Sequence, residues 1–127
     1  MNKAALCFCG SAIPFQDCCE KYITGIEKAP TALALMKSRY SAYVTQQVDY
    51  LLATTHSSQR KYYSKADILS WATANEWQKL EIISFTENTV EFKAYFLDQN
   101  KQNQIHHEFS TFKKEKDSWF YVDGKFE

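Results

Sequence analysis

The stretch VEFKAYF at residues 90–96 sets the fold class, because apolar and polar side chains alternate along it without a break. Such alternation is typical of a β-strand with one buried face. Further runs near residues 80–85, 105–114 and 118–123 also have strand character, and short polar segments separate them as hairpin turns would. We therefore expect four antiparallel strands, joined as a meander, in the C-terminal half of the chain.

Ahead of these strands the hydrophobic period is helical. Thr31 is a candidate N-cap, and apolar residues recur at helical spacing after it as far as Tyr43. A second, short helix is expected over residues 49–55, and Ser64 followed by Asp67 has the form of a capping box that opens a third. Three helices before an antiparallel meander predict an α+β domain with the helices on one face of the sheet.

The composition limits the classes of partner. The chain has 127 residues, 45% of them hydrophobic and 16% aromatic, which suits one ordinary domain with a short appendage. Its 15 basic and 15 acidic residues balance, and this argues against nucleic acid as a partner. No apolar run reaches the roughly 20 residues that span a bilayer, so no membrane association is expected. We expect a cytoplasmic protein, in which reducing conditions keep thiols free.

The cysteines form two close pairs near the N-terminus, and they are Cys7, Cys9, Cys18 and Cys19. A tetrahedral zinc site takes four thiolates at about 2.3 Å, and two pairs joined by a turn can hold the metal from both sides. Two disulfides, a redox dithiol pair and an Fe–S cluster are the alternatives. A bond between the vicinal cysteines would be strained, the helical Cys-x-x-Cys spacing is absent, and such compact spacing is typical of zinc.

The order C-x-C-G-S, six residues, C-C over residues 7–19 resembles the SEC-C zinc motif. In that family the four cysteine positions bind zinc, so the resemblance implies a zinc knuckle, which we place at residues 1–24. The family typically has a Gly followed by lysines around an aromatic residue between the ligand pairs. This chain has Ala12 and keeps the aromatic as Phe15, but it has no lysine there, which argues against acidic partners for the knuckle.

The remainder of the chain resembles the YchJ-like family of small bacterial proteins. The stretches that carry the resemblance include LMKSRYSAY at 35–43, DYLL at 49–52 and WFYVDG at 119–124. That family joins a SEC-C knuckle to a nuclear transport factor 2-like domain. The resemblance implies a cone-shaped α+β domain over residues 25–127, with three helices packed on a curved antiparallel sheet that encloses a pocket. Domains of this fold often dimerise through the open sheet face, so analogy suggests a homodimer.

Five polar residues are candidates for that pocket, namely Arg39, His56, Glu108, Tyr121 and Asp123. A buried Arg39 needs a carboxylate, and we expect a bidentate pair with Glu108. That pair either locks helix to sheet or leaves Arg39 to orient an anionic ligand. His56 is either a general base near neutral pH or a helix-end residue. Asp123 either shares a strand face with Tyr121 or belongs to a turn.

The sequence contains no Ser-His-Asp order, phosphate loop or glycine-rich cradle. We therefore expect a non-catalytic binding or adaptor module with structural zinc, whose partner is a protein or a small-molecule ligand. The alternative is a small-molecule enzyme of lyase or isomerase type that uses the pocket of the cone. A deep apolar cavity with a titratable group pointing inward would favour the enzyme, whereas a cavity filled by aromatic side chains would exclude it.

Overall fold

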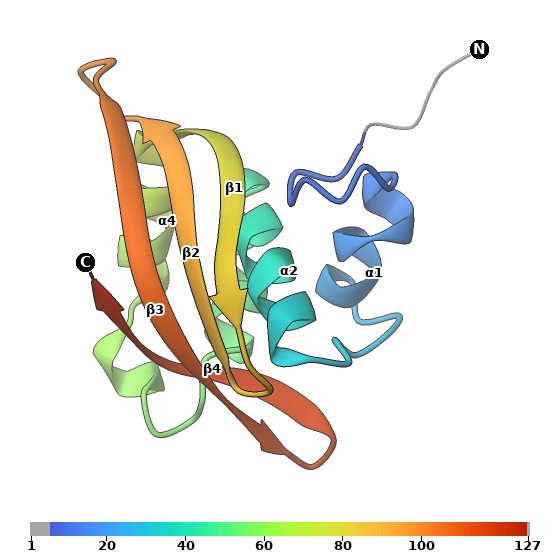
Figure 1. Ribbon diagram of the computed structural model, residues 1–127. Helices are drawn as coiled ribbons and strands as arrows, with labels where there is room; N and C mark the ends of the chain where they lie inside the picture. The colour runs from blue at the N-terminus through green and yellow to red at the C-terminus, as the bar shows by residue number, and fades with distance from the viewer. Residues whose placement is uncertain (1–5, 127) are drawn as a thin grey trace.

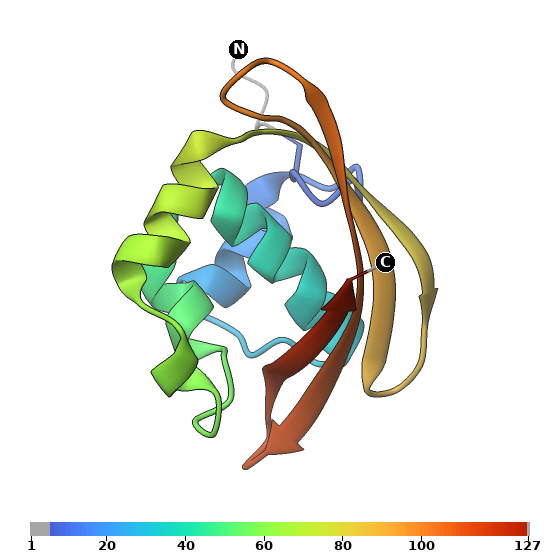
Figure 2. The same ribbon diagram turned by 90° about the vertical axis from the view of Figure 1, so that its left-hand side faces the viewer.

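A computed structural model describes residues 6–126 and shows a layer of helices packed on one face of a four-stranded sheet (Figures 1 and 2). The helices are α1 (Cys19–Ile23), α2 (Ala32–Val44), α3 (Val48–Ala53) and α4 (Lys65–Ala74), with 3-10 turns at Phe15–Asp17 and Arg60–Tyr62. The strands are β1 (Glu76–Phe85), β2 (Thr89–Leu97), β3 (Asn103–Glu115) and β4 (Ser118–Phe126). The predicted α+β class and the helix-to-strand order are confirmed.

Two helices begin where the sequence predicts. The Thr31 hydroxyl accepts from the Ala34 amide at 3.0 Å and caps α2. The Ser64 hydroxyl accepts from the Asp67 amide, also at 3.0 Å, and caps α4. Each cap satisfies one of the amide donors that a helix leaves free in its first turn. The short α3 ends at Ala53, two residues before the predicted limit, and the 3-10 turn after it was not predicted.

The sheet is an antiparallel meander in the order β1-β2-β3-β4, as predicted. Along β2 the alternating side chains Val90, Phe92, Ala94 and Phe96 are buried, so the face that the pattern predicted is the face that packs on the helices. The longest helix, α2, lies across the sheet and contacts β1, β2 and β4. The core therefore forms between α2 and the concave face of the sheet.

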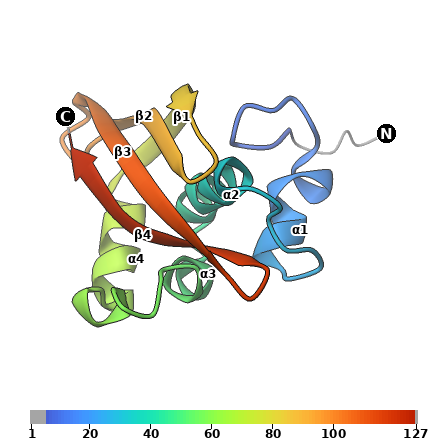
Figure 3. The same cartoon turned by 60° about the horizontal axis from the view of Figure 1, so that its bottom comes forward.

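The sheet is curved, and bulges mark where it bends. Register shifts occur at two places between β1 and β2 and at one place, Thr111/Phe112, between β3 and β4. A bulge inserts a residue into one strand, bends that strand and increases the local twist. Figure 3 shows the result, a sheet that wraps around α2. The cone shape that the resemblance implied is confirmed, although hydrophobic alternation alone gives no sign of it.

The cysteine-bearing segment packs beside α2 (Figure 1). The Cys7 sulfur lies 3.5 Å from the Ser41 hydroxyl of α2, and Leu80 of β1 packs against the buried cysteines. The short helix α1 also contacts α2. This segment, described from residue 6 onward, is thus seated on the cone. None of the helices within residues 6–126 has the length and apolar character needed to cross a membrane.

Candidate functional site

The four cysteine sulfurs gather into one cluster. All four Sγ atoms lie within 4.8 Å of one another, and the Cys9 and Cys18 sulfurs are 3.7 Å apart. Tetrahedral coordination with bonds of about 2.3 Å places sulfurs about 3.8 Å apart, so this spacing suits a four-sulfur metal site. All four cysteines are free thiols, and only Cys18 is partly exposed. The cluster is therefore compatible with metal binding.

A tight turn between the cysteine pairs brings them together. Gly10 has a φ of 86°, in the left-handed region that glycine adopts without strain, and its amide donates to the Cys7 carbonyl at 3.3 Å. The Ser11 hydroxyl lies 3.2 Å from the Cys18 sulfur. Hydrogen bonds from the Cys19 thiol and then from Ser11 outweigh burial and lower the pKa of Cys9 to about 4. This sulfur is thus a thiolate at neutral pH, the form that binds metals.

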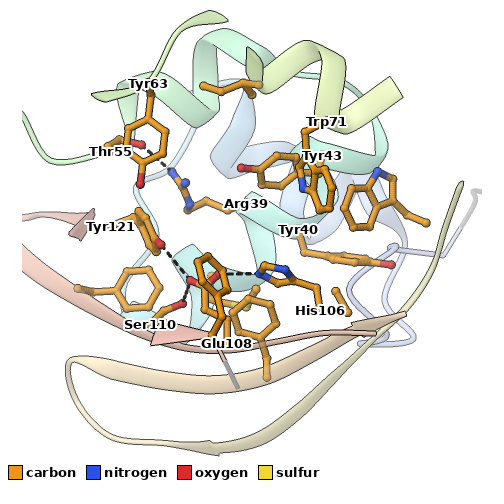
Figure 4. Close-up of a pocket in the computed structure, with 17 residues that line it drawn as sticks. Arg39, Tyr40, Tyr43, Thr55, Tyr63, Trp71, His106, Glu108, Ser110 and Tyr121 are labelled. Atoms are coloured by element: carbon orange, nitrogen blue, oxygen red, sulfur yellow. Dashed lines mark hydrogen bonds and ion pairs between the residues drawn. The ribbon is translucent and has the colours of Figure 1, made fainter. Parts of the chain in front are cut away.

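A cavity of about 470 Å³ lies between the concave face of the sheet and the helices (Figure 4). This volume falls within the range typical of small-molecule sites, about 300–1,000 Å³. Its lining is mainly aromatic and aliphatic, with a few polar groups, and consists of Met36, Arg39, Tyr40, Tyr43, Thr55, Tyr63, Ile68, Trp71, Trp77, Phe92, Ala94, His106, Glu108, Ser110, Phe112, Tyr121 and Phe126. The cavity that the resemblance implied is therefore present, and aromatic side chains do not fill it.

Glu108 is the central polar group of the cavity wall, and it is only 7% exposed. Its carboxylate accepts from His106 Nε2 at 2.7 Å, from the Ser110 hydroxyl and from the Tyr121 hydroxyl at 3.0 Å (Figure 4). Burial works to raise the pKa of this carboxyl, but these hydrogen bonds and the nearby imidazole outweigh it, and the pKa lies below its ordinary value. Glu108 is therefore ionised at neutral pH.

Gly124 leaves the space that this carboxylate occupies. Gly124 pairs with Ser110 across the β3–β4 ladder. A methyl group there would overlap the Glu108 carboxylate and press against the Tyr121 hydroxyl. The absence of a side chain at this position is thus a steric requirement of the site.

The predicted bidentate pair between Arg39 and Glu108 is wrong. Arg39 Nη1 donates instead to the Leu51 carbonyl at 2.8 Å and the Thr54 hydroxyl at 2.7 Å. Tyr121 contacts both groups: the guanidinium carbon of Arg39 lies 4.6 Å from the centroid of its ring, and its hydroxyl donates to Glu108. The end of α3 offers Arg39 nearer acceptors than the carboxylate.

His56 does not line the cavity, contrary to its place among the candidates. Its Nε2 lies 2.8 Å from Glu115 and its Nδ1 lies 2.8 Å from the Ser58 hydroxyl, while its ring and that of Phe120 form a T-shaped pair. His56 is buried at the start of the segment that follows α3. Its amide donates to the Tyr121 carbonyl at 2.7 Å, so its position serves to attach β4 to that segment.

Asp123 also points away from the cavity, and the bulge at Thr111/Phe112 explains why. Tyr121 pairs with Phe112, whereas Asp123 pairs with Thr111, so the bulge changes which residues of β4 face inward. Side chains alternate along a strand, and one extra residue reverses the alternation beyond it. The expectation that Asp123 shares a face with Tyr121 is therefore wrong, and Asp123 is exposed.

His106 and His107 are adjacent on β3, so their side chains point to opposite faces of the sheet. His106 lines the cavity although it was not among the candidates, and His107 pairs with Glu91 on the outer face. Ser110 was missed altogether. Both His106 and Ser110 lie two positions from Glu108, so strand alternation was the signal that could have grouped them.

Models of two protein families match the chain. The SEC-C motif matches residues 5–21, and the middle, nuclear transport factor 2-like domain of YchJ matches residues 31–124. Among its relatives, the UPF0225 protein of Geobacter sulfurreducens is 37% identical over 126 residues, covering 94% of this chain and 78% of the relative. The UPF0225 protein of Photorhabdus laumondii is 41% identical, with 94% and 79% covered.

Two solved structures have the same fold. A SEC-C motif containing protein from Rhodopseudomonas palustris superposes with a TM-score of 0.88 at 31% identity, covering 95% of this chain and 98% of that one. A SEC-C motif containing protein from Psychrobacter arcticus superposes with a TM-score of 0.77 at 33% identity, covering 97% and 75%. A cone with an N-terminal cysteine knuckle is thus an arrangement that this chain shares with its relatives.

Proposed function

Since this chain belongs to the YchJ-like family of SEC-C proteins, we propose that it is a non-catalytic binding module, stabilised by zinc, whose cavity holds a small organic molecule. One observation carries the proposal above all others. The cavity of about 470 Å³ is open although the chain has ample aromatic side chains to fill it. Protein interiors are otherwise close-packed, and empty apolar space destabilises a fold, so a maintained cavity favours a ligand.

Zinc is the metal that the cysteine cluster suits best. The cluster offers four sulfurs at tetrahedral spacing and no carboxylate or imidazole. A closed four-sulfur set leaves no position open for a substrate, which is typical of structural zinc. The contact of Cys7 with Ser41 and the packing of Leu80 against the cluster favour a structural role, in which the metal holds the knuckle together where it packs on α2 and β1.

The polar groups of the cavity favour binding over catalysis. The Glu108 carboxylate is engaged by three donors of the protein itself, and its lowered pKa makes it a weak base. Burial first, and then the charge of Glu108, raise the pKa of Tyr121, so its phenol is a poor acid. The Glu108 carboxylate and the Tyr121 phenol are hydrogen-bonded to each other, so they can position a ligand but exchange protons poorly.

A lyase or isomerase is the second candidate, and one contact favours it. His106 lines the cavity, and its Nε2 is held by Glu108 at 2.7 Å. A carboxylate that orients an imidazole in this way leaves the other ring nitrogen able to act as a general base. In that case His106 would be the catalytic residue and Glu108 a positioning residue.

Native mass spectrometry of protein purified without added ligand tests the proposal. We expect about one zinc ion per chain, as a four-thiolate site requires, together with a small-molecule adduct. Ala94 is buried in the cavity wall, so Ala94→Met should displace the adduct and keep the zinc. A wild-type protein without zinc, or an adduct that survives Ala94→Met, would contradict the proposal. Conversion of the released molecule by wild type but not by His106→Gln would favour the enzyme.

A further inference from the structure

Arg39 is a buried cation whose contacts are all uncharged. It is 9% exposed, and its Nη1 donates to the Leu51 carbonyl and to the Thr54 hydroxyl, with the Thr55 hydroxyl at 3.4 Å. The ring of Tyr121 lies against the guanidinium plane. Within residues 6–126 these groups are its partners, and none of them carries a negative charge. A buried charge without a counter-ion is costly, so the site favours an anion from outside.

One edge of the guanidinium faces the cavity. In the described part of the chain, Nε and Nη2 of Arg39 donate no hydrogen bond. Every fully buried side-chain nitrogen or oxygen there has a partner, so these two nitrogens are not fully buried. Those two nitrogens are therefore open to the cavity that Arg39 lines. Figure 4 shows the guanidinium between Tyr63 and Tyr121, at the side of the cavity where the helices meet β4.

The free edge has a specific chemistry. The Nε–H and one Nη2–H of a guanidinium point in the same direction, and their spacing matches the two oxygens of a carboxylate. A lysine or a hydroxyl offers no such pair of parallel donors. The geometry thus favours a planar oxyanion over a halide or a neutral carbonyl.

The rest of the cavity suits an apolar, flat body. Figure 4 shows Tyr40 and Trp71 on the side of the cavity away from the guanidinium. Trp77 and Phe92 also line the cavity, and the rings of Trp71 and Trp77 meet edge to face at 5.9 Å. Glu108 offers little to a cationic ligand, because its carboxylate is already engaged by three donors. A cation would also meet the uncompensated charge of Arg39.

From this arrangement we infer that the cavity takes an aromatic carboxylic acid, whose carboxylate binds side-on to Nε and Nη2 of Arg39 while its ring system packs on the tryptophan wall. This inference rests on the proposed binding function and names its ligand class. Tyr121 would contribute to the same site, because its ring packs on the Arg39 guanidinium and its hydroxyl donates to Glu108.

The NMR signals of the arginine side chains can show whether a ligand contacts Arg39. The chain's arginines are Arg39 and Arg60, so their Nε–H signals are readily assigned in a ¹H–¹⁵N spectrum. Arg60 Nε already donates to the Thr55 carbonyl at 2.8 Å and serves as an internal control. The zinc-loaded full chain would be titrated with benzoate, 2-naphthoate and indole-3-acetate, each beside its neutral carboxamide. We expect the acids to move the Arg39 signal and leave that of Arg60 in place.

Substitutions at the two arginines test the same contact through binding affinities. Wild type should bind the acids at least about tenfold more tightly than their carboxamides, as a charge-assisted bidentate pair predicts. Arg39→Gln should abolish this preference, and Arg60→Gln should retain it. Arg39→Lys keeps the charge without the fork and should retain only part of the preference. If Arg39→Gln does not fold, the inference is tested by whether the acids shift the Nε–H signal of Arg39 in the wild-type protein.

The outcomes separate the two proposals. Equal affinity for acids and carboxamides, with an unmoved Arg39 signal, would overturn the carboxylate inference and leave the binding module standing. An acid preference that survives Arg39→Gln would overturn the inference in the same way. Binding of neither series would also overturn the carboxylate inference, while the adduct seen by native mass spectrometry would still decide the binding module.

Discussion

The knuckle and the cavity are built in opposite ways. The knuckle takes its four sulfurs from a short contiguous stretch between Cys7 and Cys19, and a turn at Gly10 brings them together. The cavity takes its polar groups from distant parts of the chain, with Arg39 on α2, Glu108 on β3 and Tyr121 on β4. The first site depends on local spacing, the second on how the strands pair.

This difference predicts how each site responds to change. The knuckle meets the cone at few polar points, of which the Cys7–Ser41 contact is one, so its loss should leave the cavity in place. The polar groups of the cavity contact one another, so a change at one of them should spread to the others. If the two regions are separable, a substitution in one of them should leave the other unchanged.

Loss of a metal ligand should have the largest effect, and it should stay within the knuckle. Cys9→Ser removes one of four sulfurs, and structural zinc sites contribute about 10 kcal/mol or more of apparent binding free energy. We expect zinc content, measured by mass spectrometry, to fall to near zero. The near-ultraviolet circular dichroism of the aromatic cavity should persist, because the cone's own core lies between α2 and the sheet.

The matched control keeps all four ligands. Ser11→Ala removes only the hydroxyl that lies 3.2 Å from the Cys18 sulfur. It should weaken zinc binding by about tenfold, the effect typical of losing a hydrogen bond to a metal ligand. Unfolding of the cone in Cys9→Ser would show that the knuckle is part of the core, and the separation argued above would fail.

Gly124→Ala should cause the next largest effect, this time in the cone. The added methyl would overlap the Glu108 carboxylate and displace it from its donors. Overpacking together with a broken buried network should lower the free energy of unfolding by about 3 kcal/mol, measured by urea titration. Asp123→Ala is the control, because Asp123 is an exposed neighbour on the outer face and should change stability by less than about 0.5 kcal/mol. Equal effects of the two changes would contradict the placement of the bulge.

Glu108→Gln should cost less and should depend on pH. The folded state holds the pKa of Glu108 below its ordinary value of 4.5, so the ionised group stabilises the fold fully above about pH 4.5. That contribution is lost as pH falls below 4.5 through the folded pKa. We expect the variant to be about 2 kcal/mol less stable than wild type at pH 7, with the gap narrowing on acidification.

Glu115→Gln is the control for this titration. The pKa of Glu115 is also lowered, first by the hydrogen bond from His56, but its side chain is 43% exposed and solvent screens its charge. The variant should therefore show a much smaller pH-dependent gap. A Glu108→Gln gap that is constant from pH 7 to pH 3.5 would mean that the role of Glu108 is steric.

Much of the fold follows from local signals, and the structure shows why the rest does not. The caps at Thr31 and Ser64 and the alternation along β2 are properties of a few adjacent residues, and all were predicted. The cysteine cluster is local in the same sense. The inward face of β4 depends on a bulge at Thr111/Phe112, and no composition or spacing in the sequence marks it.

The partner of Arg39 is another non-local property. Burial of a cation among apolar helix positions predicted a carboxylate partner for Arg39, and of this prediction only the burial is confirmed. It could not predict that a carbonyl and a hydroxyl at the end of α3 would be nearer than Glu108. Two residues that each require a partner do not thereby pair with each other, because tertiary geometry decides among all the acceptors within reach.

Two glycine substitutions should have the smallest effects, and they test whether the knuckle and the cone respond independently. Ala12 in the knuckle and Asp117 in the β3–β4 hairpin have φ values of 63° and 65°. The left-handed region costs a residue with a side chain about 1–2 kcal/mol, and glycine relieves this strain at some entropic cost. Ala12→Gly should therefore raise zinc affinity about threefold in a chelator competition.

Asp117→Gly should act on the cone alone. Its turn also has a positive φ at Lys116, and such two-residue hairpins favour glycine at the second position. We expect the free energy of unfolding of the cone to rise by about 0.5 kcal/mol, with zinc affinity unchanged. Both substitutions relieve the same kind of backbone strain. If one changes only zinc affinity and the other only the free energy of unfolding of the cone, the cause is that one lies in the knuckle and the other in the cone. If each substitution changed both zinc affinity and the free energy of unfolding, the knuckle and the cone would be energetically coupled, and the Cys7–Ser41 contact would be the candidate link. Ser41→Ala should then abolish the coupling.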